Sequence, residues 1–141
     1  MCKPAYDECY LESMLLKIRY LFKLIARNDD NPFPLIQRYM ESVYRKYMDM
    51  GNPLYLNKTP KQIMREIGMN PKIIFEISDK YDEFILEWMA DVYTYMQWKY
   101  NIPSSEIVNK IKPEDLYRKF SPLHEASLTN AVDKLRQIYQ V

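Results

Sequence analysis

Glycine, cysteine and histidine are scarce in this 141-residue sequence, which has two, two and one of them respectively. Strand-rich folds need glycine at bulges and turns, so its scarcity favours helices. Gly51 and Gly68 cannot form the glycine-rich loops that bind dinucleotides or phosphates. Structural zinc sites usually use four closely paired Cys or His ligands, and Cys2, Cys9 and His124 are too few. We therefore expect no metal or cofactor.

A long apolar run, a signal sequence and an excess of one charge are also missing. No stretch approaches the roughly 18 consecutive apolar residues of a membrane span, and the N-terminal residues have no apolar core. The two cysteines make no disulfide framework, so we expect a cytoplasmic protein with reduced thiols and no membrane contact. The net charge of +1 lacks the basic excess of a dedicated nucleic-acid binder.

Apolar and aromatic residues, in contrast, are abundant. Hydrophobic residues make up 48% of the chain, with 13 tyrosines and nine methionines. A chain of this length is one domain by default and can bury a core. Tyrosine and methionine fill helical cores and also form adaptable contact surfaces. These numbers predict a folded domain and leave room for a binding surface.

The stretch 79–100 is predicted to be the central helix. It contains no glycine or proline, and its apolar residues recur at three- and four-residue steps. The stripe expected to be buried comprises Tyr81, Phe84, Ile85, Trp88, Met89, Val92, Tyr95 and Met96. Ser78 is the expected N-cap, and Asn101 with the following Ile102-Pro103 ends the helix.

The remaining segments predict two more long helices and several short ones. The long ones span about 6–27 and 33–50, and the short C-terminal ones lie within 104–139. Residues 52–58 should form an extended connector, whose Leu54 and Leu56 tuck against the helices. Thr59-Pro60-Lys61-Gln62 has the pattern of a capping box, and 70–77 predicts another short helix. The predicted fold is all-α: one compact single-domain bundle over 1–141, with N-terminal helices in 6–50.

Catalytic patterns are weak. His124 is the only histidine and would have to be the base for any Ser or Cys nucleophile. The favoured reading is structural: His124 packs against the central helix and bonds a backbone carbonyl. No two of the 19 acidic residues stand out as a catalytic pair. We therefore expect a protein that is not an enzyme, with an unrecognised carboxylate site as an open alternative.

Charged residues form two rows at helical spacing and one basic segment. The positive row is Arg19, Lys23 and Arg27, the negative row is Glu83, Glu87 and Asp91, and the basic segment contains Lys110, Lys112, Arg118 and Lys119. Both rows are interpreted as solvated faces. The alternatives are a phosphate-contacting stripe for the first row and a patch for a basic partner for the second. The helix pair 104–111 and 113–119 resembles a helix-turn-helix but lacks its usual turn glycine.

Aromatic side chains are dense at the end of the central helix. Tyr93, Tyr95, Trp98 and Tyr100 lie within eight residues. They cannot share one side, because positions 93 and 95 are about 200° apart on a helix. One subset must meet the short C-terminal helices or reach the surface, where aromatics favour partner binding. These four residues and His124 are the candidate partner-binding residues.

Part of the C-terminal half resembles a known family. A long aromatic helix is followed by Tyr100-Asn101, then by Ser104-Ser105-Glu106-Ile107-Val108, then by Leu123-His124 and a final amphipathic helix. This order, over about 84–139, is similar to a family of small helical bacterial proteins of unknown function. Members of that family are often encoded beside ADP-ribosyltransferase-like toxins, in pairs that resemble toxin–antitoxin systems. The resemblance implies a bacterial or phage protein that binds another protein, and it transfers no catalytic residues.

These observations together predict a non-enzymatic protein–protein interaction module, antitoxin- or immunity-like, whose partner is another protein such as a toxin encoded nearby. A nucleic-acid-binding regulator, using the positive row or the basic segment, is the alternative. An enzyme with a carboxylate site is the second alternative. Homo-oligomerisation through an exposed aromatic patch is compatible with all three.

Overall fold

The computed structural model describes residues 3–28, 31–68 and 80–141, and all their regular secondary structure is helical. A short 3-10 helix, η1 (Glu8–Tyr10), precedes the α-helices. These are α1 (Leu11–Asn28), α2 (Phe33–Glu41), α3 (Val43–Asp49), α4 (Pro53–Leu56), α5 (Pro60–Glu66), α6 (Glu83–Tyr100), α7 (Ser104–Lys110), α8 (Pro113–Leu123) and α9 (Leu128–Tyr139). The prediction of an all-α protein is confirmed. None of the helices in these ranges is long and apolar enough to cross a membrane.

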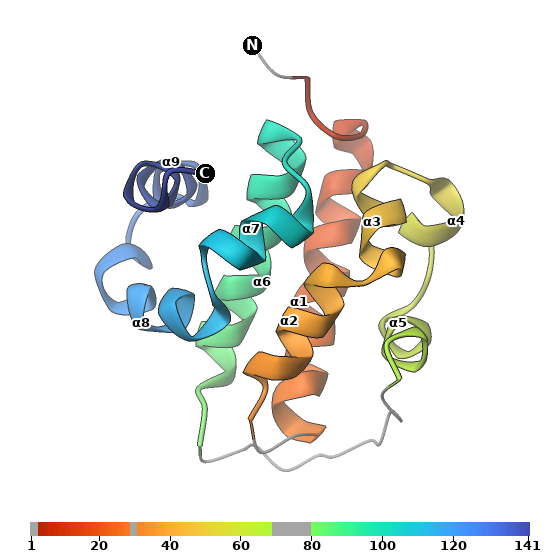
Figure 1. The fold of residues 1–141 in the computed structure, drawn as a ribbon, viewed down its shortest axis with the longest axis horizontal. Coiled ribbons are helices and arrows are strands. Elements are labelled where there is room, and N and C mark those ends of the chain that lie inside the picture. Colours follow the sequence, from red (N-terminus) through yellow and green to blue (C-terminus); the bar gives the residue numbers. More distant parts are fainter. Residues whose placement is uncertain (1–2, 29–30, 69–79) are drawn as a thin grey trace.

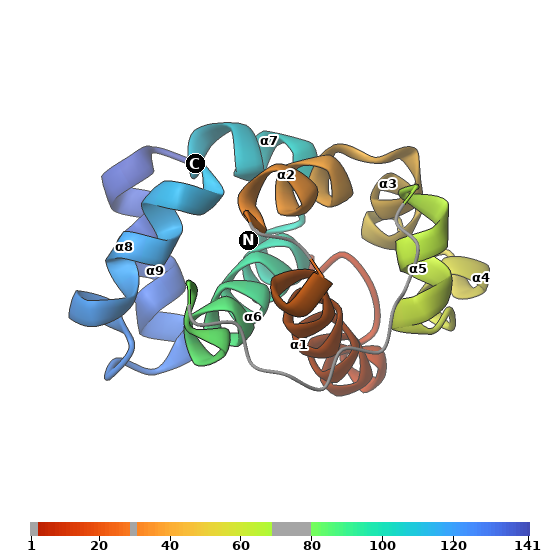
Figure 2. The ribbon, with the colours of Figure 1, turned by 90° about the horizontal axis from the view of Figure 1, so that it is seen from below.

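Helices α1 and α6 lie side by side and antiparallel at the centre of the fold (Figure 1). Helices α8 and α9 pack along the side of α6, whereas α5 packs against α1 on the opposite flank. Helices α2 and α7 pack together across the central pair, as Figure 2 shows from below. The other helices are thus arranged around one central pair.

Helix α6 is buried over more of its circumference than one stripe. Its buried residues include Leu86, Met89, Ala90, Val92, Tyr93, Thr94, Met96, Gln97 and Trp98. Such all-round burial is typical of a helix enclosed by neighbours. The expectation that Phe84 is buried is wrong, because 77% of it is exposed. Phe84 lies in the first turn of α6, where Glu83 contacts α1, so its exposure shows that this neighbour leaves one side of the turn uncovered.

The two charged rows face each other across the central pair. The Arg27 guanidinium makes a two-pronged contact with Glu83, at 2.5 Å from Nε to Oε1 and 3.2 Å from the second nitrogen to Oε2. Arg19 Nε lies 2.5 Å from Asp91 Oδ1. Burial raises the pKa of the Asp91 carboxyl, and the Arg19 guanidinium opposes that rise. The predicted solvated acidic face is therefore wrong: the antiparallel packing brings opposite charges together.

The predicted helix 33–50 is interrupted at Ser42. This residue is extended, with φ −70° and ψ 150°. Its hydroxyl donates to the Tyr39 carbonyl at 2.7 Å and accepts the Arg45 N–H at 3.0 Å. Serine thus ends α2 and caps α3, because its short side chain competes for backbone hydrogen bonds. The apolar periodicity concealed this change of direction.

Local capping signals elsewhere give mixed results. The Thr59 capping box is present, with Gln62 returning its hydrogen bond, and Asn101 ends α6 in the left-handed region at φ 51°. Residues 52–58 contain helix α4 instead of an extended connector, and Leu54 is 74% exposed, although Leu56 is buried. Asp82 is the N-cap of α6, so the central helix begins at Glu83 and not at residue 79 with Ser78 as its cap. Ser78 and the helix predicted over 70–77 lie outside the described residues.

Candidate functional site

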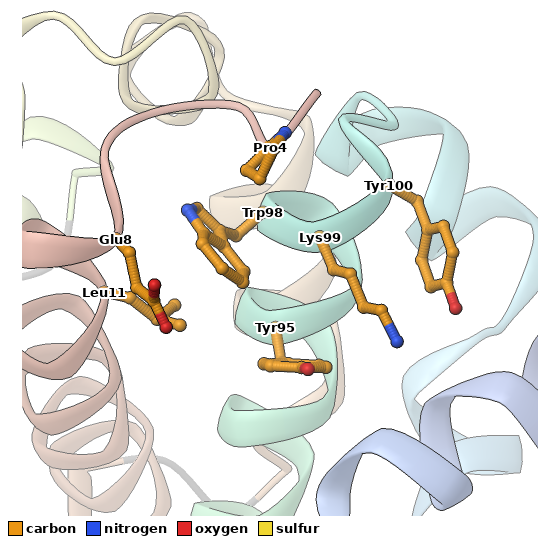
Figure 3. A pocket seen from close by; sticks show the side chains of 7 residues that line it. All are labelled: Pro4, Glu8, Leu11, Tyr95, Trp98, Lys99 and Tyr100. Atoms are coloured by element: carbon orange, nitrogen blue, oxygen red, sulfur yellow. The ribbon is translucent and has the colours of Figure 1, made fainter. Parts of the chain in front are cut away.

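An aromatic pocket lies where the C-terminal end of α6 meets the residues that precede and begin α1 (Figure 3). Its volume is about 480 Å³. The lining residues are Pro4, Glu8, Leu11, Tyr95, Trp98, Lys99 and Tyr100. Two segments about 90 positions apart in the chain thus form its walls. We call this cavity the aromatic pocket.

Trp98 joins the two walls of the aromatic pocket. Its indole Nε1–H donates to the Tyr6 carbonyl at 2.7 Å, and its own backbone carbonyl accepts the Ala5 N–H at 2.8 Å. We call residues 4–7 the strap. Two backbone groups of the strap therefore bond Trp98 of α6, one through its side chain and one through its backbone. The Trp98 side chain is 7% exposed, so its orientation is fixed by packing as well as by hydrogen bonds.

Tyr95 and Tyr100 are anchored to α9. The Tyr95 hydroxyl lies 3.0 Å from the Thr129 hydroxyl, and the Tyr100 hydroxyl donates to the Asp133 carboxylate. The Tyr95 and Trp98 rings are 5.9 Å apart, tilted by 46°. Both tyrosines remain half-buried. Ring orientations set by such bonds are largely fixed before any ligand arrives.

Two charges of opposite sign lie at the edges of the aromatic pocket. Lys99 Nζ lies 5.8 Å from the centre of the Tyr95 ring and 5.1 Å from that of Tyr100, which are cation–π distances. It also lies 3.9 Å from Asp133 Oδ1. Glu8 belongs to the opposite wall and is exposed. The pocket therefore combines an apolar interior with one acidic and one basic residue.

The structure gathers only some of the predicted partner-binding residues. Tyr95, Trp98 and Tyr100 line the aromatic pocket. Tyr93 is a core residue, 1% exposed, whose hydroxyl donates to the Ile111 carbonyl at 2.7 Å. His124 lies at the end of α8, outside the pocket lining.

The surroundings of His124 agree with one part of the structural interpretation, the contact with a backbone carbonyl. Its ring stacks on Phe120 with 4.4 Å between centres, and Phe120 contacts Trp88 of α6. The Nδ1 atom is 2.9 Å from the Phe120 carbonyl oxygen and 3.1 Å from that of Ser121. The backbone contact that the sequence predicted is therefore present. The expected packing against the central helix is not, because the exposed His124 ring stacks on Phe120 of its own helix and it is Phe120 that contacts α6.

Sequence reasoning missed four lining residues: Pro4, Glu8, Leu11 and Lys99. Lys99 could have been found, because it lies between Trp98 and Tyr100 and extends the same end of the helix. The other three carried no local signal, since only the path of residues 3–11 across α6 brings them there.

A buried polar cluster lies apart from the aromatic pocket. Arg45 is 1% exposed, and its guanidinium contacts Asp49 at 2.9 Å, the Ser104 hydroxyl at 2.8 Å and the Tyr39 hydroxyl at 2.9 Å. Asp49 also accepts the Ser104 N–H at 2.7 Å and its hydroxyl at 2.6 Å. This ion pair joins α3 to the start of α7. We interpret it as a structural cluster, because it contains a single carboxylate and no second acid or base.

Metal binding finds no support in the geometry. In the ranges that the structure covers, no group of three or more His, Cys, Asp or Glu side chains is placed to hold a metal ion. A carboxylate enzyme requires acidic side chains that converge on one site. Glu83 and Asp91 do not form such a cluster, because each of them contacts an arginine of α1 instead.

Positive charge for the nucleic-acid alternative lies mainly on α7 and α8. In the positive row, Arg19 and Arg27 contact acids of α6. Lys110 and Lys112 are exposed at the junction of α7 and α8. Arg118 is also exposed, and its guanidinium is 3.7 Å from Asp115.

Comparisons of the chain with protein-family models, curated proteins and solved structures found no match. The resemblance of residues 84–139 stays a prediction.

Proposed function

We propose that this chain is a non-enzymatic protein-binding module that holds an apolar side chain of a partner protein in the aromatic pocket. The single observation that carries the proposal is the pocket itself, where Tyr95, Trp98 and Tyr100 gather at one end of α6. Tryptophan and tyrosine are the residues that contribute most binding free energy at protein interfaces, commonly in well-packed pockets.

Preorganisation supports this use of the site. Hydrogen bonds to the Tyr6 carbonyl, the Thr129 hydroxyl and the Asp133 carboxylate hold the three aromatic side chains. Immobilising a flexible side chain on binding costs about 0.5–1.5 kcal/mol. These rings are already ordered in the free protein. Binding a partner therefore incurs less of this entropic cost than it would with three flexible side chains.

The expected partner segment has one apolar side chain flanked by polar groups. The interior formed by Leu11, Tyr95 and Trp98 suits an aliphatic or aromatic side chain. Lys99 and Glu8 can contact an acidic and a basic group on either side of it, which favours one orientation. A volume of about 480 Å³ falls in the range of pockets that take small ligands, so the aromatic pocket has room for one large side chain.

The antitoxin- or immunity-like part of the proposal has a separate basis. It depends on the resemblance of residues 84–139 to small bacterial proteins encoded beside toxins. Tyr95 and Tyr100 fall inside that region, and Tyr100-Asn101 is one of its shared motifs. Trp98 is not a feature that the family requires, so the pocket supports protein binding more directly than it supports a toxin as the partner.

The test is co-expression with each neighbouring gene product, followed by affinity purification and size-exclusion chromatography with light scattering. Glu8→Trp places a bulky side chain in the pocket from an exposed position, and Glu106→Trp adds the same bulk at an exposed first-turn position of α7. We expect a stoichiometric complex for the wild type and for Glu106→Trp, and its loss for Glu8→Trp. Equal binding by both variants would show that the partner binds elsewhere. No complex with any neighbour would remove the antitoxin-like interpretation.

A further inference from the structure

The strap, residues 4–7, is attached to α6 by two hydrogen bonds and to the hydrophobic core by the Tyr6 side chain. On one side it bonds Trp98 through Ala5 N–H and the Tyr6 carbonyl, at 2.8 and 2.7 Å. On the other side it crosses the end of α3, where a Cβ added to Gly51 would lie 3.0 Å from Tyr6 Cβ. Pro4 and Asp7 are exposed. Tyr6 is thus the strap residue that packs against the core, and none of the four residues is fully buried. Segments with few buried residues open at a lower free energy than the core.

We call the position of the strap against α6 its seated state. In this state one polar group of Tyr6 lacks a hydrogen bond to the part of the chain that the structure describes. Its hydroxyl is buried and has no hydrogen-bond partner among the described residues. Burial raises the pKa of this hydroxyl to about 12, with the positive charge of Arg45 opposing the rise. A buried hydroxyl without a partner loses its hydration and gains no bond in return. This cost offsets part of the stabilisation that the Tyr6 ring gains by packing against the core, and so lowers the free energy of opening.

The strap also builds part of the aromatic pocket. Pro4 belongs to it, and Glu8 follows it directly; both line the cavity (Figure 3). When residues 4–7 leave α6, the indole of Trp98 loses its acceptor and the pocket loses the Pro4 wall. The open and seated states therefore differ in the surface that they offer to a side chain in the pocket.

We propose that the strap opens and closes as one unit and that occupation of the aromatic pocket holds it seated. A ligand that binds one of two states better must shift the population toward that state by linkage. The nature of the ligand in the aromatic pocket, an apolar side chain of a partner, rests on the proposed function. The opening of the strap does not depend on it. The strap thus regulates whether the pocket is available.

Hydrogen exchange by NMR tests the opening. We expect the Ala5 amide and the Trp98 indole proton to exchange together, at least about tenfold faster than the most protected amides of α6. Gly51→Ala adds a methyl group against Tyr6, while Gly68→Ala is the matched control. Both glycines have positive φ, 74° and 81°, but the added Cβ at Gly68 meets nothing within 4 Å. Because only Gly51→Ala crowds the strap, we expect it to speed exchange of the two protons about tenfold more than Gly68→Ala does.

The coupling is tested with N-acetyl-L-leucine methylamide as the probe. Its binding is followed by the backbone amide shift of Lys99, and strap exchange is measured at about ten times its Kd. A probe that binds only the seated state slows exchange of the Ala5 amide by about tenfold. If the probe changes the amide shift of Lys99 but leaves the exchange rate of the Ala5 amide unchanged, the coupling is refuted. The pocket would then still bind the probe, so the proposed function would be unaffected.

Other outcomes overturn the inference in distinguishable ways. A probe that shifts no pocket resonance in the wild type would remove the pocket as an acceptor, and with it the proposed function and the coupling. Exchange of Ala5 and Trp98 only at the rate of the α6 core would show that the strap does not open separately. Equal effects of Gly51→Ala and Gly68→Ala on these exchange rates would show that the contact between Gly51 and Tyr6 does not hold the strap in place.

Discussion

Replacing Arg45 by methionine is the sharpest test of how this fold is held together. The guanidinium is buried and contacts Asp49, Ser104 and Tyr39 at 2.8–2.9 Å. Methionine fills much of the same volume but makes none of these bonds. The substitution therefore removes the positive charge while leaving the carboxylate of Asp49 in place.

The expected cost follows from what remains around Asp49. Breaking a buried ion pair by removing one partner costs about 3–5 kcal/mol, because a buried charge is left uncompensated. Asp49 keeps two donors, the Ser104 N–H at 2.7 Å and hydroxyl at 2.6 Å, and its side chain is 11% exposed. We therefore expect the low end of that range, about 3 kcal/mol lost from the free energy of unfolding.

Urea unfolding followed by circular dichroism measures this loss. Arg118→Met is the control, because Arg118 pairs with Asp115 at 3.7 Å with 78% of its side chain exposed. Exposed pairs contribute little, so we expect a change of no more than about 0.5 kcal/mol there. The reasoning is refuted if Arg45→Met lies within about 1 kcal/mol of the wild type at an unchanged denaturant slope.

Three further predictions concern local features. Thr59→Ala should lower stability by about 1 kcal/mol by removing the capping bond to the Gln62 N–H, as thermal unfolding would reveal; an unchanged melting temperature would mean that the cap contributes nothing. Arg27→Glu should destabilise the protein, and adding Glu83→Arg should recover part of the loss, because the reversed pair restores attraction; a double variant no better than the single one would contradict this pairing. The pKa of Tyr6 is raised from 10.0 to about 12, so the folded state holds its proton more tightly, and stability present below pH 10 should fall between pH 10 and 12. Tyr6→Phe should flatten this fall in urea titrations, and an identical pH slope would speak against it.

Local sequence signals succeeded where the structure depends on a few neighbouring residues. The capping pattern at Thr59 and the stop at Asn101 act within one or two turns, so local propensity suffices. The break at Ser42 carried the same kind of signal, a serine that can bond its own backbone. Apolar spacing on both sides of it hid the change of direction.

The candidate site was only partly predictable. Tyr95, Trp98 and Tyr100 stand out by aromatic density alone, and helical geometry correctly required Tyr93 to face another way. Whether each was covered depended on which helices packed beside α6. That choice is made by the whole set of core contacts and not by residues 93–100 themselves.

The sequence by itself determined that the chain is helical, where several of its helices begin and end, and which faces are apolar. Only the tertiary structure decided that Arg19 and Arg27 pair with Asp91 and Glu83, which lie 72 and 56 positions away in the chain. It likewise decided that Trp98 bonds a carbonyl 92 positions away and so completes a pocket. Caps and propensities act over a few residues, whereas such contacts depend on how the helices pack, and packing is settled by the entire core at once.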